Sequence, residues 1–276
     1  MKTALIQLCA SDDPEANLAQ TLAYVAQAAR AGAGFVLTPE VTNCVSTSRS
    51  RQQAVLQPEA TDPTLAGLRA AARAHGLWLL IGSLALKTGD ADGRFANRSF
   101  LIGPDGAVVA RYDKIQMFDV AVSPEETYRE SAGFRPGTRA VVADTPFGRV
   151  GLSICYDIRF PHLYQALARA GARILTVPAA FSPVTGAAHW RPLLRARAIE
   201  TGAFVLAPAQ TGTHPAQAGK PRRTHGHSLA VSPWGEVLLD AGTDPGVHIL
   251  EIDGKSVEAA RRKVPSLEHI RPFDGP

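Results

Sequence analysis

Short apolar segments alternate with helix-like segments over most of this chain, and the alternation restricts the fold more than any other feature. Residues 4–8 and 35–37 are apolar and short enough for buried strands, and the stretch 14–30 between them carries leucine, valine and alanine at helical spacing. The same unit follows with a helix at 63–75 and a strand at 77–86. Strands separated by helices lie side by side under those helices, so the pattern predicts an α/β protein.

Three glycine-containing turns interrupt the alternation. Residues 103–106, 145–148 and 234–235 each separate two apolar segments, which is typical of β-hairpins. Because hairpins add antiparallel pairs to parallel strands, we expect a mixed sheet covered by helices. No linker or fixed-period repeat divides the chain, and we predict a single domain over residues 1–276. Further helices are expected at 161–170, 188–200 and 257–263, and further strands at 174–178 and 204–210.

The composition is that of a chain able to fold without disulfides or structural metals. Of its 276 residues, 45% are hydrophobic and 20% are charged. The net charge is +4, but basic residues form no run of five, and the clusters at 222–223 and 261–263 are typical of solvated surface. We therefore expect no nucleic-acid partner. The apolar stretches at the N-terminus and at 77–86 are too short for a signal peptide or a membrane span, so no membrane partner is expected.

The cysteines and histidines argue against disulfides and metal sites. Cys9, Cys44 and Cys155 form an odd set without CxxC spacing, which indicates reduced thiols and a cytoplasmic protein. His225 and His227 lack a third ligand at useful spacing, so we expect no metal and no other cofactor.

Two polar residues stand where apolar strands end. Glu40 follows the strand at 35–37, and Cys155 closes the predicted strand at 149–155, before a turn that leads into a helix. Ligands of open α/β sheets gather at the carboxyl ends of strands, where burial raises a carboxylate pKa and suits it to acid–base chemistry. A turn between strand and helix exposes a nucleophile and directs backbone N–H groups at an oxyanion. Taken alone, Glu40 could be a helix cap and Cys155 a buried hydrophobic residue.

Lys114 and Glu130 lie between these two residues in the chain. Lys114 follows the first hairpin, and an ammonium group near a thiol would lower the thiol pKa and stabilise a tetrahedral intermediate. Glu130 lies in the loop-like stretch that comes next. Each of these residues, taken alone, is typical of a solvated surface.

Several motifs together resemble the nitrilase superfamily of carbon–nitrogen hydrolases, almost from end to end of the chain. One motif would be weak, but their common order and spacing are specific. The resemblance implies an α-β-β-α sandwich of the nitrilase type, a single carbon–nitrogen hydrolase domain that assembles into a homodimer or higher homo-oligomer. The motifs are Thr38-Pro39-Glu40, Tyr112-Asp113-Lys114-Ile115, residues 151–161 around Cys155, Ala188-His189-Trp190, residues 195–201 and Gly226-His227-Ser228.

The resemblance also implies catalytic roles. Cys155 would be the nucleophile, Glu40 the general base and Lys114 the group that stabilises the oxyanion. Glu130 would position the substrate or assist proton transfer, and the backbone N–H of Tyr156 would help to hold the oxyanion.

Three residues are expected to contact the substrate: Tyr156, Arg159 and Phe181. Arg159 is a candidate partner for a substrate carboxylate, because its planar guanidinium matches that geometry. An ion pair with Asp157 or another acid is an equal alternative.

Within the superfamily, the chain resembles the branch of omega-amidases and deaminated-glutathione amidases. This implies thiol-dependent hydrolysis of a terminal amide to ammonia and an acid, with an ω-amide of an α-keto acid such as deaminated glutathione as substrate. An N-carbamoyl-amine hydrolase or a nitrilase on the same scaffold is an alternative. So are an inactive binding or assembly module and a glutaminase subunit that feeds ammonia to a partner.

Three residues depart from the family pattern. His162 and Arg191 stand where glutamate is usual, and His225 stands where tyrosine is usual. We expect Arg191, which reverses a charge beside the site, to affect substrate specificity most.

Overall fold

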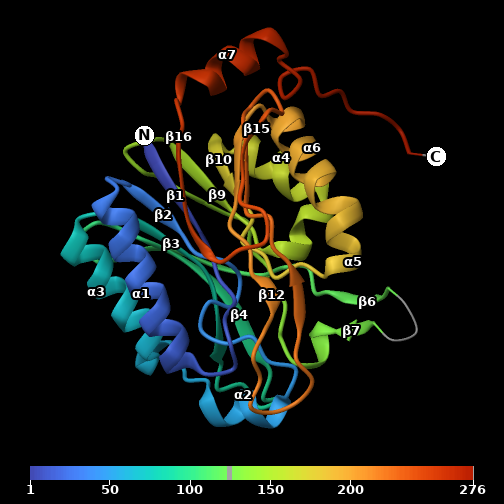
Figure 1. Ribbon diagram of the computed structural model, residues 1–276. Helices are drawn as coiled ribbons and strands as arrows, with labels where there is room; N and C mark the ends of the chain where they lie inside the picture. The colour runs from blue at the N-terminus through green and yellow to red at the C-terminus, as the bar shows by residue number, and fades with distance from the viewer. Residues whose placement is uncertain (123–125, 276) are drawn as a thin grey trace.

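Two six-stranded sheets, packed face to face, form the centre of the molecule (Figure 1). The computed structural model describes residues 1–122 and 126–275. The first sheet has the order β16-β1-β2-β3-β4-β5, with β1 at Lys2–Gln7, β2 at Phe35–Leu37, β3 at Trp78–Lys87, β4 at Phe95–Ile102, β5 at Val108–Asp113 and β16 at Gly246–Glu251. The second has the order β15-β14-β11-β10-β9-β8, with β8 at Val141–Ala143, β9 at Arg149–Leu152, β10 at Ala172–Thr176, β11 at Phe204–Ala207, β14 at Leu229–Val231 and β15 at Val237–Asp240.

Both sheets are mixed, as predicted. Strands β1, β2 and β3 run parallel, as do β9, β10 and β11. The three predicted hairpins are confirmed as the antiparallel pairs β4–β5, β8–β9 and β14–β15.

Helices cover the outer face of each sheet (Figure 1). Helices α1 (Pro14–Arg30) and α3 (Pro63–His75) pack on the first sheet, and α4 (Pro161–Arg169) and α6 (Arg191–Thr201) pack on the second. The layers therefore follow in the order α-β-β-α, which confirms the predicted architecture.

The strands of the first sheet are apolar on both faces because both faces are covered. In β1, Ala4 and Ile6 pack toward α1 and α3, whereas Leu5 packs toward the second sheet. The same split separates Val36 from its neighbour Leu37 in β2. Since successive side chains of a strand point to opposite faces, burial on both sides requires an uninterrupted apolar run.

Local capping sets the ends of the first two long helices. The Asp13 side chain accepts hydrogen bonds from the first turn of α1, and Asp62 accepts one from Leu65 N–H at the start of α3. Helix α3 ends at Gly76, whose φ of 62° lies in the left-handed region.

Several short elements gather at one end of the sandwich (Figure 1). They include α2 (Arg49–Val55), the pair β6 (Asp119–Ala121) and β7 (Thr127–Arg129), and the pair β12 (Thr211–Thr213) and β13 (Arg223–His225). Helix α7 (Lys255–Lys263) lies at the opposite end. Within the described part of the chain, no helix has both the length and the apolar character to cross a bilayer.

The structure differs from the sequence prediction at several element ends. The predicted strand at 149–155 ends at Leu152, and the strand at 204–210 ends at Ala207. The predicted helix at 188–200 begins earlier, with α5 (Pro183–Thr185) and a π-helical turn at Gly186–Trp190 before α6. Strand β16, helix α2 and the two small strand pairs were not predicted, because such short elements depend on tertiary partners rather than on local pattern.

Candidate active site

Cys155 lies in a sharp turn after β9. Its φ of 50° is in the left-handed region, which residues other than glycine rarely adopt. Its N–H donates to the Pro178 carbonyl oxygen at 2.9 Å, which ties the turn to the segment after β10. The chain continues as a 3₁₀ turn over Cys155–Arg159 and then as α4, so the predicted strand-to-helix elbow is present.

A buried carboxylate, Asp157, holds this turn. It accepts hydrogen bonds from the Ile154 N–H at 2.9 Å, the Tyr112 hydroxyl at 2.7 Å and the Gln116 N–H at 2.9 Å. Burial raises the pKa of Asp157 to about 6, although these hydrogen bonds oppose the shift. Since Tyr112 and Gln116 flank Lys114, Asp157 connects the turn at Cys155 to the lysine segment.

Arg159 does not pair with Asp157, so that alternative is wrong. The Arg159 guanidinium lies 3.2 Å from Nδ1 of His189 and over the rings of Tyr156 and Phe181, at 5.8 and 5.6 Å from their centroids. It forms no ion pair with any acid in the described ranges.

Glu40 lies in the loop after β2, against which β3 packs very closely. A Cβ atom at Gly82 of β3 would lie 2.0 Å from the Thr38 carbonyl oxygen and 2.6 Å from Pro178 Cβ. Only glycine therefore allows β3 to contact both the Glu40 loop and the segment after β10.

Four groups surround the Glu40 carboxylate, which is 4% exposed. Its Oε1 accepts from Lys114 Nζ at 2.9 Å and from Asn97 Nδ2 at 2.8 Å. Its Oε2 accepts from the Ala180 N–H at 2.8 Å. The thiol of Cys155 interacts with the same carboxylate.

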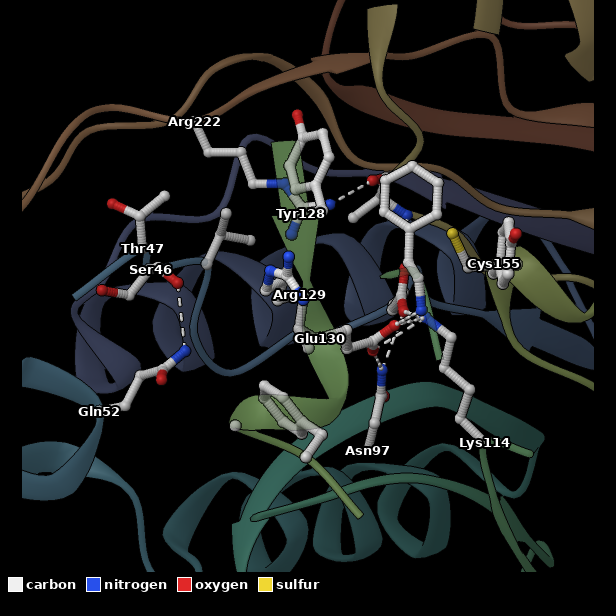
Figure 2. A pocket seen from close by; sticks show the side chains of 18 of the residues that line it. Ser46, Thr47, Gln52, Asn97, Lys114, Tyr128, Arg129, Glu130, Cys155 and Arg222 are labelled. Atoms are coloured by element: carbon white, nitrogen blue, oxygen red, sulfur yellow. Dashed lines mark hydrogen bonds and ion pairs between the residues drawn. The ribbon is translucent and has the colours of Figure 1, made fainter. Parts of the chain in front are cut away.

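Lys114 connects Glu40 to Glu130. Figure 2 shows Lys114 beside Glu130 and Asn97. The Nζ of Lys114 lies 2.9 Å from each carboxylate oxygen of Glu130, and Glu130 Oε2 also accepts from the Phe118 N–H at 2.7 Å. Asn97 Nδ2 lies 3.4 Å from Glu130 Oε1 and so lies between the two carboxylates. The structure thus brings together Glu40, Lys114 and Glu130, with Cys155 beside them.

Charge and burial act against each other in this cluster. Burial tends to raise the pKa of Glu40, but the positive charges of Lys114 and Arg222 lower it below its ordinary value. Burial tends to lower the pKa of Lys114, but Glu130 and Glu40 raise it. Burial and the charge of Glu40 raise the pKa of the Cys155 thiol more than Lys114 lowers it. The resting site therefore holds a carboxylate, an ammonium group and a thiol.

Two expectations about these pKa values are thus wrong. Burial does not leave Glu40 with a raised pKa, because Lys114 is in direct contact with it. Lys114 does not leave Cys155 with a lowered pKa, because the thiol is buried and faces the negative charge of Glu40.

A cavity of about 470 Å³ opens over the cluster, and all four candidate catalytic side chains line it. The predicted substrate contacts Tyr156 and Phe181 also line it, whereas Arg159 does not. The N–H of Tyr156 has no acceptor within the described ranges, so it can donate to an oxygen held at Cys155.

The residues that depart from the family pattern do not line this cavity, although the His225 N–H donates to the carbonyl oxygen of Phe181, which does. His162 and Arg191 are exposed, and His225 packs on Gly186; none of them lines the cavity. Arg191 therefore does not touch the cavity itself, and its effect on substrate specificity stays a prediction. His225 stacks on His227 at 4.7 Å, and the described residues include no group of three side chains suited to a metal ion.

Sequence reasoning missed several residues of the site. Asn97 gave no distinct signal, since it begins the polar run Asn97-Arg98-Ser99 in the middle of β4. Arg222 was interpreted as solvated surface, but it lines the cavity together with Arg129 and Arg49. No local pattern identifies these arginines, because Arg49 begins α2, Arg129 ends β7 and Arg222 precedes β13, and none of these short elements was predicted.

Comparison with known proteins defines the class. The family model described as carbon-nitrogen hydrolase matches residues 2–262, and the chain belongs to this family. It is 39% identical over 269 residues to the deaminated glutathione amidase of Yersinia enterocolitica. The aligned region covers 97% of this chain and 92% of that protein.

Solved structures agree with this assignment. The structure matches the C. elegans NitFhit protein with a TM-score of 0.90 and 34% identity, over 98% of this chain and 65% of that one. It matches an amidase mutant from Nesterenkonia sp. AN1 with a TM-score of 0.77 and 28% identity, over 96% of this chain and 98% of that one. That structure shows Michael addition of acrylamide at the active-site cysteine. The chain is thus an amide-hydrolysing enzyme of the nitrilase type.

Proposed function

We propose that Cys155, Glu40, Lys114 and Glu130 perform thiol-dependent amide hydrolysis. The observation that carries this proposal is the placement of the Lys114 ammonium 2.9 Å from both carboxylates, in the cavity that also contains the Cys155 thiol. Base, electrophilic stabiliser and nucleophile then contact one bound substrate.

The raised thiol pKa indicates that the proton leaves sulfur during attack rather than before it. Glu40 accepts that proton while Sγ bonds to the amide carbon, and the oxyanion receives hydrogen bonds from Lys114 and the Tyr156 N–H. Because protonated Glu40 no longer neutralises Lys114, the ammonium charge becomes available to the oxyanion. Glu130 keeps Lys114 charged and in place.

The tetrahedral intermediate then breaks down with cleavage of its carbon–nitrogen bond. Glu40 returns its proton to the departing nitrogen, and a thioester to Cys155 remains. The same carboxylate activates a water molecule that releases the acid and restores the thiol.

We propose deaminated glutathione as the substrate, as named for the Yersinia relative. Its scissile nitrogen belongs to the cysteine residue, so the amine released is cysteinylglycine; a primary ω-amide would release ammonia instead. A cavity of about 470 Å³ is within the usual range for small-molecule sites. Tyr156 and Phe181 would contact the substrate within the cavity, and Arg159 would act from behind their rings.

Turnover of deaminated glutathione, followed by chromatography of 2-oxoglutarate and cysteinylglycine, tests the proposal. Cys155→Ala should abolish turnover, whereas Cys44→Ala is a matched control, because Cys44 is buried and lines the same cavity. Mass spectrometry of quenched reactions should show a thioester at Cys155. An adduct at Cys44, or turnover that survives Cys155→Ala, would refute the assignment. Release of carbon dioxide from carbamoyl amines would favour a carbamoylase.

We also propose a cytoplasmic homo-oligomer. All three cysteines are free, as a reducing compartment requires. Ile199 and Trp234, each 54% exposed, lie close together, since Gly235 packs toward Ile199. Exposed apolar side chains of this size are typical of interfaces. Light scattering of the purified protein should give at least twice the monomer mass, and a monomer mass would rule the assembly out.

A further inference from the structure

The cavity contains more positive charge than its carboxylates neutralise. The Lys114 ammonium already bonds both Glu40 and Glu130. The other three cationic side chains of the cavity, Arg49, Arg129 and Arg222, form no ion pair with any acid in the described ranges. The cationic side chains that line the cavity are Arg49, Lys114, Arg129 and Arg222.

Arg49 already has a structural role. Its guanidinium donates to the carbonyl oxygens of Gly133, at 2.9 Å, and of Gly93, and it lies 3.8 Å from the ring centroid of Phe95. These contacts use its donors within the protein, so it is not a candidate for ligand binding.

Arg222 is held rigidly but is only partly used. Its Nη2 donates to the Ala180 carbonyl oxygen at 2.7 Å, and the N–H of the same Ala180 donates to Glu40 Oε2 at 2.8 Å. One residue thus fixes the guanidinium relative to the general base. The guanidinium also lies 5.9 Å from the Tyr128 ring, and its Nε is buried without a hydrogen-bond partner. A buried N–H donor without an acceptor is costly unless a ligand supplies one.

Arg129 supplies a second guanidinium. It ends β7, and its side chain forms no hydrogen bond or ion pair with the described residues, although its charge acts on Asp119, its exposed neighbour across the β6–β7 pair. Figure 2 shows Arg129 and Arg222 between Ser46 and Thr47 on one side and Cys155 and Lys114 on the other.

We propose that Arg222, assisted by Arg129, binds a carboxylate of the substrate, so that the enzyme selects amides that carry a carboxylate away from the scissile bond. This inference rests on the proposed function. A guanidinium presents paired N–H donors that match a carboxylate, and such charge-assisted bonds are stronger than neutral ones. An anion also balances the charge that the cavity leaves unpaired, which a neutral amide cannot do.

Two matched substrate pairs test this subsite. For the acyl end, 2-oxoglutaramate is compared with 4-oxopentanamide, in which a methyl group replaces the carboxylate. For the leaving end, deaminated glutathione is compared with its C-terminal amide. The measured quantity is the ratio of kcat/KM for the anionic and the less anionic member of each pair.

Arg222→Gln should lower this ratio by about 10- to 100-fold for at least one pair, mainly through KM. Arg129→Gln, a more exposed position, should lower it by about 3- to 10-fold. Arg223→Gln is the control, because Arg223 is the exposed neighbour and does not line the cavity. The pair that responds shows which end of the substrate the arginines bind.

An unchanged ratio in Arg222→Gln for both substrate pairs would overturn the inference, even if both members of a pair slowed equally. An equal loss would mean that Arg222 acts on the general base Glu40 and does not bind the substrate carboxylate. A kcat/KM ratio that falls in Arg159→Gln but not in Arg222→Gln would also overturn the inference. Turnover that depends on Cys155 but shows no preference for the carboxylate removes the subsite and leaves the proposed function intact. Absence of Cys155-dependent turnover instead removes the proposed function itself.

Discussion

Lys114 places one positive charge between two buried carboxylates, and this arrangement explains the ionisation of the whole site. The ammonium contacts Glu40 and Glu130 at 2.9 Å, and Asn97 donates to both acids. Unpaired charges of this kind would be expensive to bury, but a hydrogen-bonded cluster offsets much of the cost. The thiol alone stays neutral at rest.

Glu130→Gln should lower kcat by about 100-fold with little change in KM. A glutamine offers Lys114 one acceptor oxygen where the carboxylate offers two, and it removes the charge that keeps the ammonium in place. Steady-state kinetics on the wild type and the variant measure the effect. Asp144→Asn, at an exposed carboxylate that pairs with Arg149 and does not line the cavity, is the control. A kcat within about threefold of wild type would contradict the positioning role.

The rate should be nearly independent of pH between about 7 and 9. The base form of Glu40 exists above its pKa, which lies below the ordinary 4.5, so the acid-side loss occurs at low pH. Lys114, with a pKa above 10.5, stays charged through the same range. The raised pKa of Cys155 predicts no increase in rate near pH 9 from thiolate formation. A kcat/KM profile that rises through pH 8 to 9 would show that a preformed thiolate reacts.

At the scale of elements, the site depends on close contact between segments that follow several different strands. Glu40 follows β2, Lys114 follows β5, Cys155 follows β9 and Ala180 follows β10. Gly82 in β3 allows two of these segments to meet, since any side chain there would overlap the Thr38 carbonyl oxygen.

Gly82→Ala should destabilise the fold by about 2 kcal/mol or more and lower activity, because the Glu40 loop and Pro178 must both move. Urea unfolding and turnover measure the two effects. Gly34→Ala is the matched control, because a Cβ there meets no atom within 4 Å, and its stability should stay within about 1 kcal/mol of wild type. Equal stability of the two variants would contradict the prediction, because it would show that the Glu40 loop can move away from a side chain at position 82 at little cost.

At the scale of the whole molecule, buried polar groups connect segments that are distant in sequence. The ring of His214 lies 2.7 Å from both the Ala10 carbonyl oxygen and the Thr224 hydroxyl, and it joins the segment after β1 to β13. Burial lowers the pKa of His214 to about 4, from an ordinary 6.5. The folded state therefore holds this ring neutral, and acid favours the unfolded state.

Replacing His214 with glutamine should remove a pH-dependent part of the stability. The contribution of His214 is fully present above about pH 6.5 and is lost as the pH falls toward 4, by about 3 kcal/mol in all. The wild type should therefore lose that amount relative to His214→Gln over this range. Asp157, whose raised pKa acts in the opposite direction, is present in both proteins and cancels. Denaturant unfolding of both proteins at several pH values measures the difference, and parallel pH curves would contradict the prediction.

The sequence by itself determined the class of fold and the order of the candidate catalytic residues, whereas the pairing of two sheets was implied only by the family resemblance. Apolar runs at β1, β2 and β3 predicted strands covered on both faces, and proline and glycine marked the ends of α1 and α3, because these signals are local. Glu40, Lys114 and Cys155 each stand after an apolar strand, and the carboxyl ends of strands meet at one edge.

Only the tertiary structure decided the ionisation of the site and the arginines that surround it. The pKa of Glu40 depends on Lys114 and Arg222, and Arg222 is fixed by the carbonyl oxygen of Ala180. The position of Arg159 behind aromatic rings, rather than on Asp157, follows from the packing of the turn Cys155–Arg159 against Phe181. Electrostatic energies depend on distance through space, and residues far apart in the chain reach those distances only when both sheets are packed.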